Sequence, residues 1–235
     1  MNTIEVLYQD NHLIVVGKSS GELVQPDPSG EAALEQRVAE FLRIQGNKPG
    51  AAFVGVVHRI DRPVSGAVLF AKTSKALVRL NEQMRGRGFR KIYWAIVENC
   101  PSDERGELRH YILRNAKSNK SVALNSKKGD AKEAVLRYRV AARSDRYYLL
   151  EIELLTGRHH QIRAQLSAIG SPIKGDLKYG SRRSNSDGSI SLHSRSLSFV
   201  HPTTGVDVTV LAPVPNDGLW RFFESRMSDG GGLSQ

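Results

Sequence analysis

The stretch Val-His-Arg-Ile-Asp-Arg-Pro-Val-Ser-Gly, residues 57–66, interrupts two short apolar segments that we expect to be strands. Its proline and glycine break regular structure, so Asp61 is expected on a rigid turn at a strand end. Arg59 and Arg62 flank Asp61, and nearby guanidinium groups favour the ionised form of a carboxyl group. Asp61 is therefore a candidate nucleophile or base, although a structural ion pair is the commoner use of such a cluster.

The pattern of apolar residues along the rest of the chain predicts an α+β fold. Strands are expected at 4–8, 12–17, 53–57, 67–71, 90–98, 107–114, 132–142, 147–155, 191–200 and 206–211. Helices are expected at 31–45, 74–85, about 158–169 and 219–227, and basic loops at 116–130 and 181–190. Strands and helices do not alternate as in βαβ units, which favours a mixed, largely antiparallel central sheet with flanking helices. We expect one domain at 1–227 and a flexible tail at 228–235.

A second polar stretch, Thr-Gly-Arg-His-His-Gln-Ile-Arg at residues 156–163, opens the helix expected at about 158–169. Arg163 lies beside the apolar stripe of that helix and should be half-buried. Arg158 and His159 are expected in the first turn, where cations oppose the helix macrodipole unless an anion docks nearby. Side chains that simply point into solvent are an equal alternative.

Two further segments carry candidate binding residues. Tyr93 lies on the strand expected at 90–98, on the face opposite Trp94, and a tyrosine beside basic residues can stack on a base. An ordinary half-buried strand residue is the commoner reading of such a tyrosine. The glycine-punctuated basic loop at 170–180 offers backbone N–H groups to an anion, although a structural turn is again the commoner use.

The charge balance points to a polyanionic partner. Lys and Arg total 34 against 24 Asp and Glu, a formal net charge of +10, which favours nucleic acid or an anionic membrane surface. No stretch approaches the roughly 18 apolar residues of a spanning helix, and the N-terminus lacks the pattern of a secretion signal. Cys100 is the single cysteine, which suits a reducing cytoplasm. We therefore expect a cytoplasmic protein with no membrane partner.

Motifs for metals and nucleotide cofactors are not found. The seven histidines include no His-Glu-x-x-His motif, and His159 and His160 would point about 100° apart on a helix, which makes a poor chelate. A phosphate-binding P-loop, a dinucleotide fingerprint and a nucleophile elbow are also missing. We expect neither a metal nor a cofactor.

Taken together, these segments resemble the RluA-type pseudouridine synthases. Residues 58–66 resemble the H-R-L-D-R-P-T-S-G signature, residues 157–163 the G-R-T-H-Q-I-R motif, and residues 91–93 the K-x-Y strand. Residues 172–180 and 192–202 match as well, so the resemblance spans about residues 5–211. Val64 and His159 depart from the family pattern, which has threonine at both places. The chain is expected to hold the catalytic domain, with the pseudouridine synthase fold, and no S4 domain.

The resemblance implies a role for single residues. Asp61 would be the catalytic nucleophile and Arg163 would pair with it. Tyr93 would be catalytic as well, by stacking on the target base and assisting proton removal from C5. Arg59 would fill the gap left by the flipped uridine, and Leu192 would line the base pocket. The remaining polar residues of the two motifs would contact the substrate: His58, Arg62, Arg158 and His160.

The implied reaction isomerises uridine to pseudouridine in a structured ribosomal or transfer RNA, by a monomeric enzyme. It involves no net redox change or hydrolysis, so no cofactor is required. Flipping the target nucleotide costs a few kcal/mol, which stacking on an aromatic ring and an inserted cation would offset. One alternative is a non-catalytic RNA-binding protein that retains the fold. A nucleosidase or glycosidase is disfavoured because the motifs offer only one carboxylate suited to the chemistry, while that chemistry usually needs two.

Overall fold

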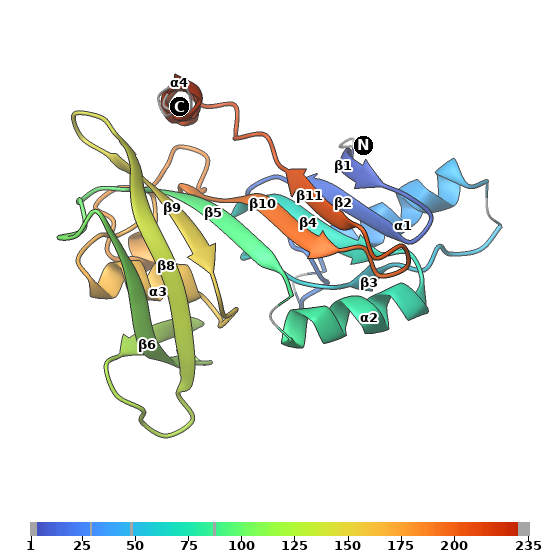
Figure 1. Ribbon diagram of the computed structural model, residues 1–235, viewed down its shortest axis with the longest axis horizontal. Coiled ribbons are helices and arrows are strands. Elements are labelled where there is room, and N and C mark those ends of the chain that lie inside the picture. The colour runs from blue at the N-terminus through green and yellow to red at the C-terminus, as the bar shows by residue number, and fades with distance from the viewer. Residues whose placement is uncertain (1–3, 29, 48, 87, 230–235) are drawn as a thin grey trace. The chain divides into compact units, whose positions relative to one another are not determined.

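The structure is a computed structural model that describes residues 4–28, 30–47, 49–86 and 88–229 (Figure 1). Most of the predicted tail, residues 230–235, lies outside this range. The chain divides into two compact units, one of residues 1–90 and 194–213 and one of residues 91–193 and 214–235. Within the described ranges, no helix is long and apolar enough to cross a membrane.

The first unit is built on a sheet with helices packed against it. Its strands run in the order β1 (Glu5–Gln9), β2 (Leu13–Lys18), β4 (Ser65–Ala71), β10 (Leu192–Val200) and β11 (Asp207–Leu211), and the short β3 (Gly55–Val56) also pairs with β4. The pairs β1–β2, β2–β4, β3–β4 and β10–β11 are antiparallel.

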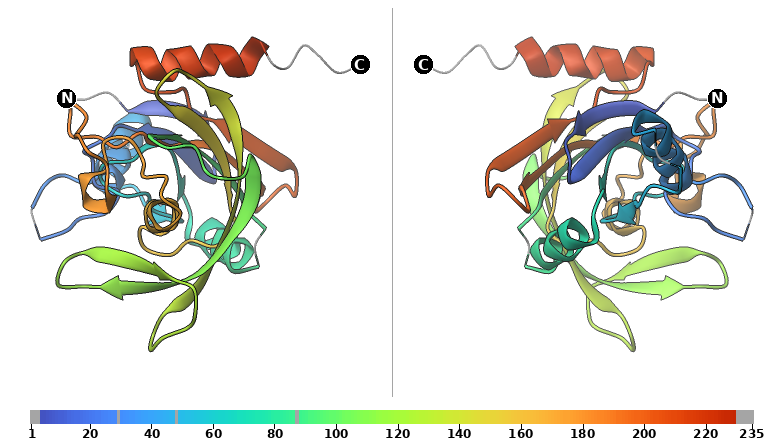
Figure 2. Two further views of the ribbon diagram at one scale, coloured as in Figure 1. Left: turned by 90° about the vertical axis from the view of Figure 1, so that its left-hand side faces the viewer. Right: turned by 90° about the vertical axis from the view of Figure 1, so that its right-hand side faces the viewer.

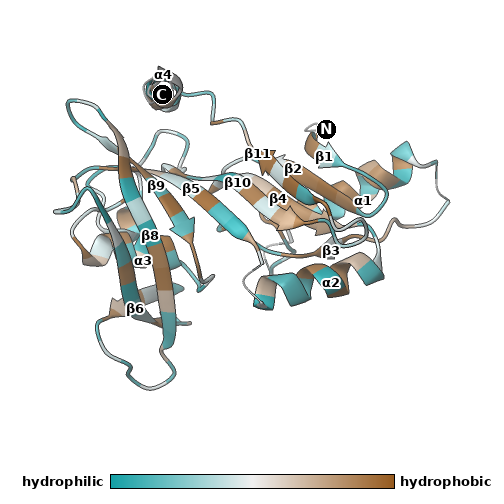
Figure 3. Ribbon diagram, in the orientation of Figure 1, coloured by the Kyte–Doolittle hydropathy of each residue, from teal (hydrophilic) through white to brown (hydrophobic). Residues whose placement is uncertain are grey.

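Burial explains why these segments form strands and helices. The apolar residues of β2 and β4 are fully buried, and one face of each strand shares a core with Ala76 and Leu80 of α2 (Ser74–Arg85). Thr73 caps α2 by accepting the N–H of Ala76 at 3.2 Å, so the predicted helix at 74–85 is confirmed. Figure 3 shows the resulting contrast between apolar β2 and β4 and the amphipathic α2. The remaining helix, α1 (Leu34–Gln45), is also amphipathic and buries Leu34, Val38 and Leu42.

The second unit is an antiparallel sheet with two helices and a short 3-10 helix. Its strands run in the order β5 (Arg90–Val97), β9 (Tyr148–Leu154), β8 (Lys132–Arg143), β6 (Arg105–Asn115) and β7 (Lys120–Leu124). Trp220 and Phe223 attach α4 (Gly218–Asp229) to Trp94 and Ile96 of β5. Ala164 of α3 (Gln161–Ala168) packs with Tyr179 of the 3-10 helix η1 (Leu177–Tyr179) in a separate cluster. The predicted α+β class with mostly antiparallel strands is confirmed.

One predicted loop was wrong. The basic segment 116–130 contains β7, which pairs with β6 to form a hairpin that Figure 2 shows projecting from the other strands of its unit. The hairpin turns at Asn119, whose φ of 45° is in the left-handed region that asparagine tolerates. Short strands with polar flanks have weak sequence signals, and pairing with β6 supplies the hydrogen bonds that stabilise this one.

Gly66, the second residue of β4, provides a test of this packing. Its φ is 116°, and a Cβ atom there would lie 2.6 Å from the amide nitrogen of Ser194. We expect Gly66→Ala to lower the free energy of unfolding by about 2–4 kcal/mol, because backbone strain and a backbone clash add. Gly205→Ala is the matched control, since φ there is 74° and no atom lies within 4 Å of the added Cβ. Urea unfolding that shows equal destabilisation of the two variants would contradict the close approach.

Candidate functional site

Asp61 lies on the turn that leads into β4, and residues 18–22 hold this turn in place. The N–H of Gly21 donates to the carbonyl oxygen of Arg62 at 2.8 Å, and Arg62 Nε donates back to the Gly21 carbonyl at 2.9 Å. The N–H of Val64 closes the turn by donating to the carbonyl oxygen of Asp61 at 3.0 Å. The backbone that carries the half-buried Asp61 side chain is therefore fixed by hydrogen bonds within its own unit.

Lys18 is a buried cation beside this turn. Its ammonium group donates to the carbonyl oxygens of Ser19 at 2.9 Å and Arg62 at 3.0 Å, and its residue is only 2% exposed. Burial lowers the pKa of Lys18 to about 8, against the opposing attraction of Glu22 and Asp61. Lys18 was not among the predicted residues, although a lysine that ends an otherwise apolar strand is the signal that marks it.

The two arginines that flank Asp61 bind other groups. Arg62 Nη2 donates to both carboxylate oxygens of Glu31, at 2.7 and 2.9 Å, and both side chains are about half exposed. Arg59 donates to the side-chain oxygen of Gln25 at 3.3 Å. The charge of Arg62 is therefore balanced in part by a carboxylate other than Asp61, which the sequence pattern did not predict.

His58 of the same stretch has a structural contact as well. Its Nε2 accepts the backbone N–H of Leu69 at 3.1 Å, so this ring nitrogen is unprotonated. The contact ties the segment before Asp61 to strand β4.

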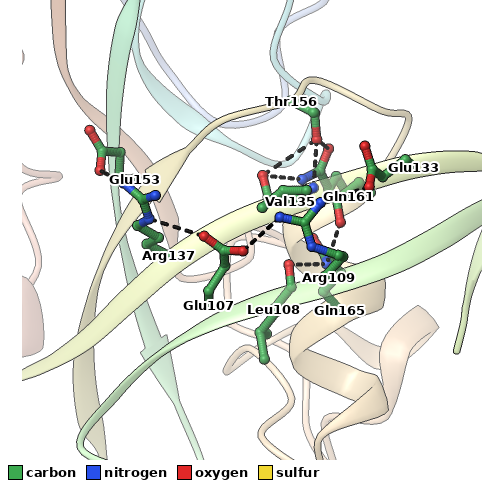
Figure 4. A network of polar contacts seen from close by, with 11 residues as sticks. Glu107, Leu108, Arg109, Glu133, Val135, Arg137, Glu153, Thr156, Gln161 and Gln165 are labelled. Carbon is green, nitrogen blue, oxygen red and sulfur yellow. Dashed lines mark hydrogen bonds and ion pairs between the residues drawn. The ribbon is translucent and has the colours of Figure 1, made fainter.

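In the second unit, two buried glutamines anchor α3 to the sheet (Figure 4). The side-chain oxygen of Gln161 accepts from Thr156 Oγ1 at 2.7 Å and from the N–H of Arg158 at 3.0 Å, while its amide donates to the Val135 carbonyl at 3.1 Å. One turn later, the Gln165 amide donates to the Leu108 carbonyl at 3.1 Å. Buried amides with several partners fix the position of α3, and hence of Arg163.

The predicted start of this helix was wrong. α3 begins at Gln161, and His160 precedes it with φ 52°, in the left-handed region. Arg158 and His159 therefore lie before the helix, and the expected conflict with its dipole does not arise. Arg158 Nε instead donates to the Glu133 carbonyl at 2.9 Å. The rings of His159 and His160 stack with centroids 3.7 Å apart, whereas regular helix geometry predicted divergent side chains.

His159, a departure from the family pattern, contacts the β6–β7 hairpin. Its Nδ1 lies 2.8 Å from Ser121 Oγ and its Nε2 3.1 Å from Asn119 Oδ1. Lys178 Nζ donates to the Asn119 carbonyl at 3.2 Å. The hairpin is therefore attached both to the segment before α3 and to η1.

His160 is held neutral by its surroundings. Burial, with the positive charge of Arg163 as the next cause, lowers the pKa of His160 to about 2. Its Nδ1 lies 2.9 Å from the hydroxyl of Tyr179, which accepts the N–H of Ser121 at 2.7 Å. The Tyr179 hydroxyl therefore joins the backbone of Ser121 to the ring of His160.

Arg163 is more deeply buried than predicted and pairs with Asp176. Nε lies 2.6 Å from Oδ2 and Nη2 lies 2.9 Å from Oδ1, and the side chains of Arg163 and Asp176 are 5% and 1% exposed. The guanidinium carbon also lies 4.9 Å from the centre of the Tyr179 ring. The sequence predicted only a glycine-punctuated loop at 170–180, which contains Asp176, and no role for this carboxylate. Its signal is a lone carboxylate in a basic loop, which needs a buried cation if the loop packs inward.

The two remaining predicted residues are buried in the same unit. Tyr93 lies in β5 opposite Ile152 of β9 and is 6% exposed, and Leu192 is buried at the start of β10. The nine predicted residues thus form two groups. His58, Arg59, Asp61 and Arg62 belong to the first unit, and Tyr93, Arg158, His160, Arg163 and Leu192 belong to the second. The pairing of Arg163 with Asp61 stays a prediction.

An ion-pair ladder, defined as the alternating charges of β6, β8 and β9, covers a solvent-facing part of the second unit (Figure 4). Glu107 pairs with Arg109 at 2.9 Å and with Arg137 at 3.1 Å, and Arg139 pairs with Glu151 at 2.9 Å. These arginines balance neighbouring glutamates, so the ladder contributes little to the net positive charge. In the described part of the chain, no group of three or more His, Cys, Asp or Glu side chains is arranged to hold a metal ion.

The buried ammonium of Lys18 gives a pH-dependent contribution to stability. Its folded pKa of about 8 lies below the ordinary value of 10.5, so between these values the unfolded chain holds a proton that the folded chain has released. The free energy of unfolding should then rise with pH in this window. Between pH 7.5 and 9.5, we expect the free energy of unfolding of wild type to rise by about 2 kcal/mol relative to that of Lys18→Met, as measured by urea unfolding.

The control for that measurement is Lys75→Met, which removes one positive charge from an exposed site on α2. The difference in the free energy of unfolding between wild type and Lys75→Met should change much less with pH than the difference between wild type and Lys18→Met. A pH-independent difference between wild type and Lys18→Met would show that Lys18 titrates alike in the folded and unfolded chains.

Comparison with known proteins agrees with the motifs. Residues 12–168 match the family model described as RNA pseudouridylate synthase. An uncharacterised RNA pseudouridine synthase of Synechocystis is 32% identical over 90% of this chain and 66% of its own length. The ribosomal large subunit pseudouridine synthase C of Escherichia coli K12 is 34% identical over 92% and 68%. The chain thus spans about two thirds of the length of these relatives.

The fold also matches solved structures. The structure of human RNA pseudouridylate synthase domain containing 4 has a TM-score of 0.77, at 22% identity, covering 95% of this chain and 93% of that one. Human RNA pseudouridylate synthase domain containing 1 has a TM-score of 0.69 at 21% identity, with 95% and 94% covered. These likenesses show the fold, while the family model and the bacterial relatives show the family. The chain belongs to the RNA pseudouridylate synthase family.

Proposed function

We propose that this chain isomerises uridine to pseudouridine in a structured RNA and that Asp61 carries the chemistry. The observation that supports this most directly is that the matched family region, residues 12–168, includes Asp61 on a turn fixed by hydrogen bonds. A fixed backbone suits a carboxylate that must meet one atom of a sugar or base. The proposal extends family membership to a specific residue.

In this reaction the bond between N1 and C1′ breaks, the uracil rotates, and a bond forms between C5 and C1′. The hydrogen on C5 then leaves as a proton and N1 gains a proton, so the reaction is an isomerisation with no net redox change. Asp61 would act as an ionised carboxylate, by attack on C1′, by addition to C6, or by taking the C2′ proton. Each route needs the ionised form, which a neighbouring cation stabilises. Arg163 would be that cation, as its family motif implies, and Lys18 adds a second positive charge on the side of residues 18–22.

The other predicted residues would bind the flipped nucleotide and its neighbours. Tyr93 would stack on the uracil, Leu192 would line its pocket, and Arg59 would occupy the space that the nucleotide leaves. His58, Arg62, Arg158 and His160 would contact the RNA directly or hold the segments that do. For His160 the second role fits better, because a buried, neutral imidazole is a poor phosphate ligand.

The substrate would be ribosomal or transfer RNA, bound in the cytoplasm. The Escherichia coli relative is named for the large ribosomal subunit, so ribosomal RNA is the first substrate to test. Mapping of pseudouridines by carbodiimide-adduct sequencing, in cells with and without the gene, identifies the modified position.

The role of Asp61 is tested by Asp61→Asn, which keeps the size of the side chain and removes its charge. We expect tritium release from RNA carrying 5-tritiated uridine to fall by at least about 10³-fold, because the amide is neither nucleophile nor base. RNA affinity should change little, since a carboxylate contributes nothing to phosphate binding. Asp145→Asn, the same change at an exposed turn, is the control. Full activity of Asp61→Asn would reject the assignment, and wild type that binds RNA without tritium release would identify a non-catalytic binding protein.

The basic segment 116–130 should contact phosphates. The triple variant Lys117→Gln, Lys127→Gln, Lys128→Gln removes three exposed positive charges from it. We expect a weaker RNA affinity and a salt dependence whose slope falls by about 0.7–0.9 for each phosphate that the variant no longer neutralises. The matched control removes three charges from the ion-pair ladder, at Arg109, Arg137 and Arg139, and should leave the slope nearly unchanged. Equal slopes for both triple variants would show that net charge alone governs binding.

A further inference from the structure

The buried pair of Arg163 and Asp176 has a consequence for the orientation of the arginine. A guanidinium group is planar and carries five N–H donors in a fixed fork. Asp176 binds the edge formed by Nε and Nη2, at 2.6 and 2.9 Å. Two parallel hydrogen bonds fix both the plane and the in-plane rotation of the group, so the edge formed by the two Nη atoms is aimed by the same contact.

Asp176 itself is held by a closed loop. Its N–H donates to the Ile173 carbonyl at 3.0 Å, and its own carbonyl accepts from Tyr179 N and Ser181 N, each at 3.0 Å. Ser181 Oγ also accepts the N–H of Gly175 at 3.0 Å. Because hydrogen bonds hold the backbone on both sides of Asp176, its carboxylate has a fixed position from which to bind Arg163.

The guanidinium group of Arg163 also lies over the ring of Tyr179. The Tyr179 ring lies 4.9 Å from the guanidinium carbon of Arg163, and its hydroxyl is bound to Ser121 N and His160 Nδ1. His160 is neutral, so it adds no repulsion to the buried arginine. A fixed carboxylate along one edge and the nearby ring of Tyr179 leave the guanidinium little rotational freedom.

We propose that Asp176 is a positioning residue for catalysis, which holds Arg163 in the orientation that the reacting carboxylate requires. This inference rests on the proposed function, in which Arg163 stabilises the ionised Asp61. Charge balance alone would be satisfied by any carboxylate near Arg163. The bidentate geometry and the closed loop add orientation, and orientation is the property that transition-state stabilisation depends on.

The test compares two substitutions of Asp176 by single-turnover kinetics with saturating RNA. Asp176→Asn removes the charge, whereas Asp176→Glu keeps it but moves the carboxylate by one methylene. We expect the rate of both variants to fall by about 10²-fold, because a displacement of about 1 Å in a catalytic group costs that much. The dissociation constant for RNA should stay close to that of wild type. Asp145→Asn serves as the control at an exposed position.

The pH–rate profile separates positioning from a merely structural role. A misaimed guanidinium stabilises the reacting carboxylate less, so the acid limb should move to higher pH in both variants. A smaller fraction of folded protein would instead lower the rate equally at every pH. If Asp176→Asn does not fold, Asp176→Glu carries the test, since it retains the neutralising charge. Wild-type rate and an unshifted limb in Asp176→Glu would overturn the proposal.

A double-mutant cycle with Arg163→Met tests whether Asp176 acts through Arg163. In the Arg163→Met background, Asp176→Asn should produce no further decrease in rate, because the group that it positions is gone. A further decrease of equal size would show an independent role and overturn the inference. Failure of the proposed function is distinguishable, because wild type would then release no tritium. If Arg163→Met lowers the rate and the Asp176 variants do not, only the positioning role is wrong.

Discussion

A charged arginine inside a protein needs a partner, and the pairing of Arg163 with Asp176 meets that requirement in the second unit. Removing one member of such a pair leaves an uncompensated buried charge, which typically costs about 3–5 kcal/mol. The pair therefore constrains the elements around it. α3 must present Arg163 inward, η1 must hold the loop of Asp176, and the Tyr179 hydroxyl joins both to β7 through Ser121.

The turn of Asp61 follows the same physical rule in the first unit. Lys18 is buried and charged below a pKa of about 8, and the backbone carbonyls of Ser19 and Arg62 solvate its ammonium group. A carbonyl of the turn therefore takes the place that water would occupy around an exposed lysine. The interaction that satisfies Lys18 also fixes the backbone beside Asp61.

The sequence predicted most helices and strands because their apolar patterns are strong and local. It failed where tertiary contacts decide. β7 depends on pairing with β6, and α3 starts only after His160, where the Gln161 side chain binds Thr156 and the N–H of Arg158 in the preceding segment. The roles of the motif residues stay predictions, and Lys18 and Asp176 were not among the predicted residues. The local signal of each is weak, a lysine at the end of an apolar strand and a lone carboxylate in a basic loop, because its importance arises only when folding removes it from water beside an opposite or polar group.

Both units thus contain charged side chains whose partners belong to the protein itself. Arg62 has Glu31, Arg163 has Asp176, and Lys18 has two carbonyls. Charged groups that are oriented before the substrate arrives need little reorganisation during the reaction, and that is the condition under which electrostatic stabilisation of a transition state is most effective. The exposed lysines of segment 116–130 differ in kind, because they lie in solvent and suit contacts with a phosphate backbone. Chemistry and RNA affinity would therefore draw on separate sets of positive charges, which is why substitutions in one set should change rate and substitutions in the other should change salt dependence.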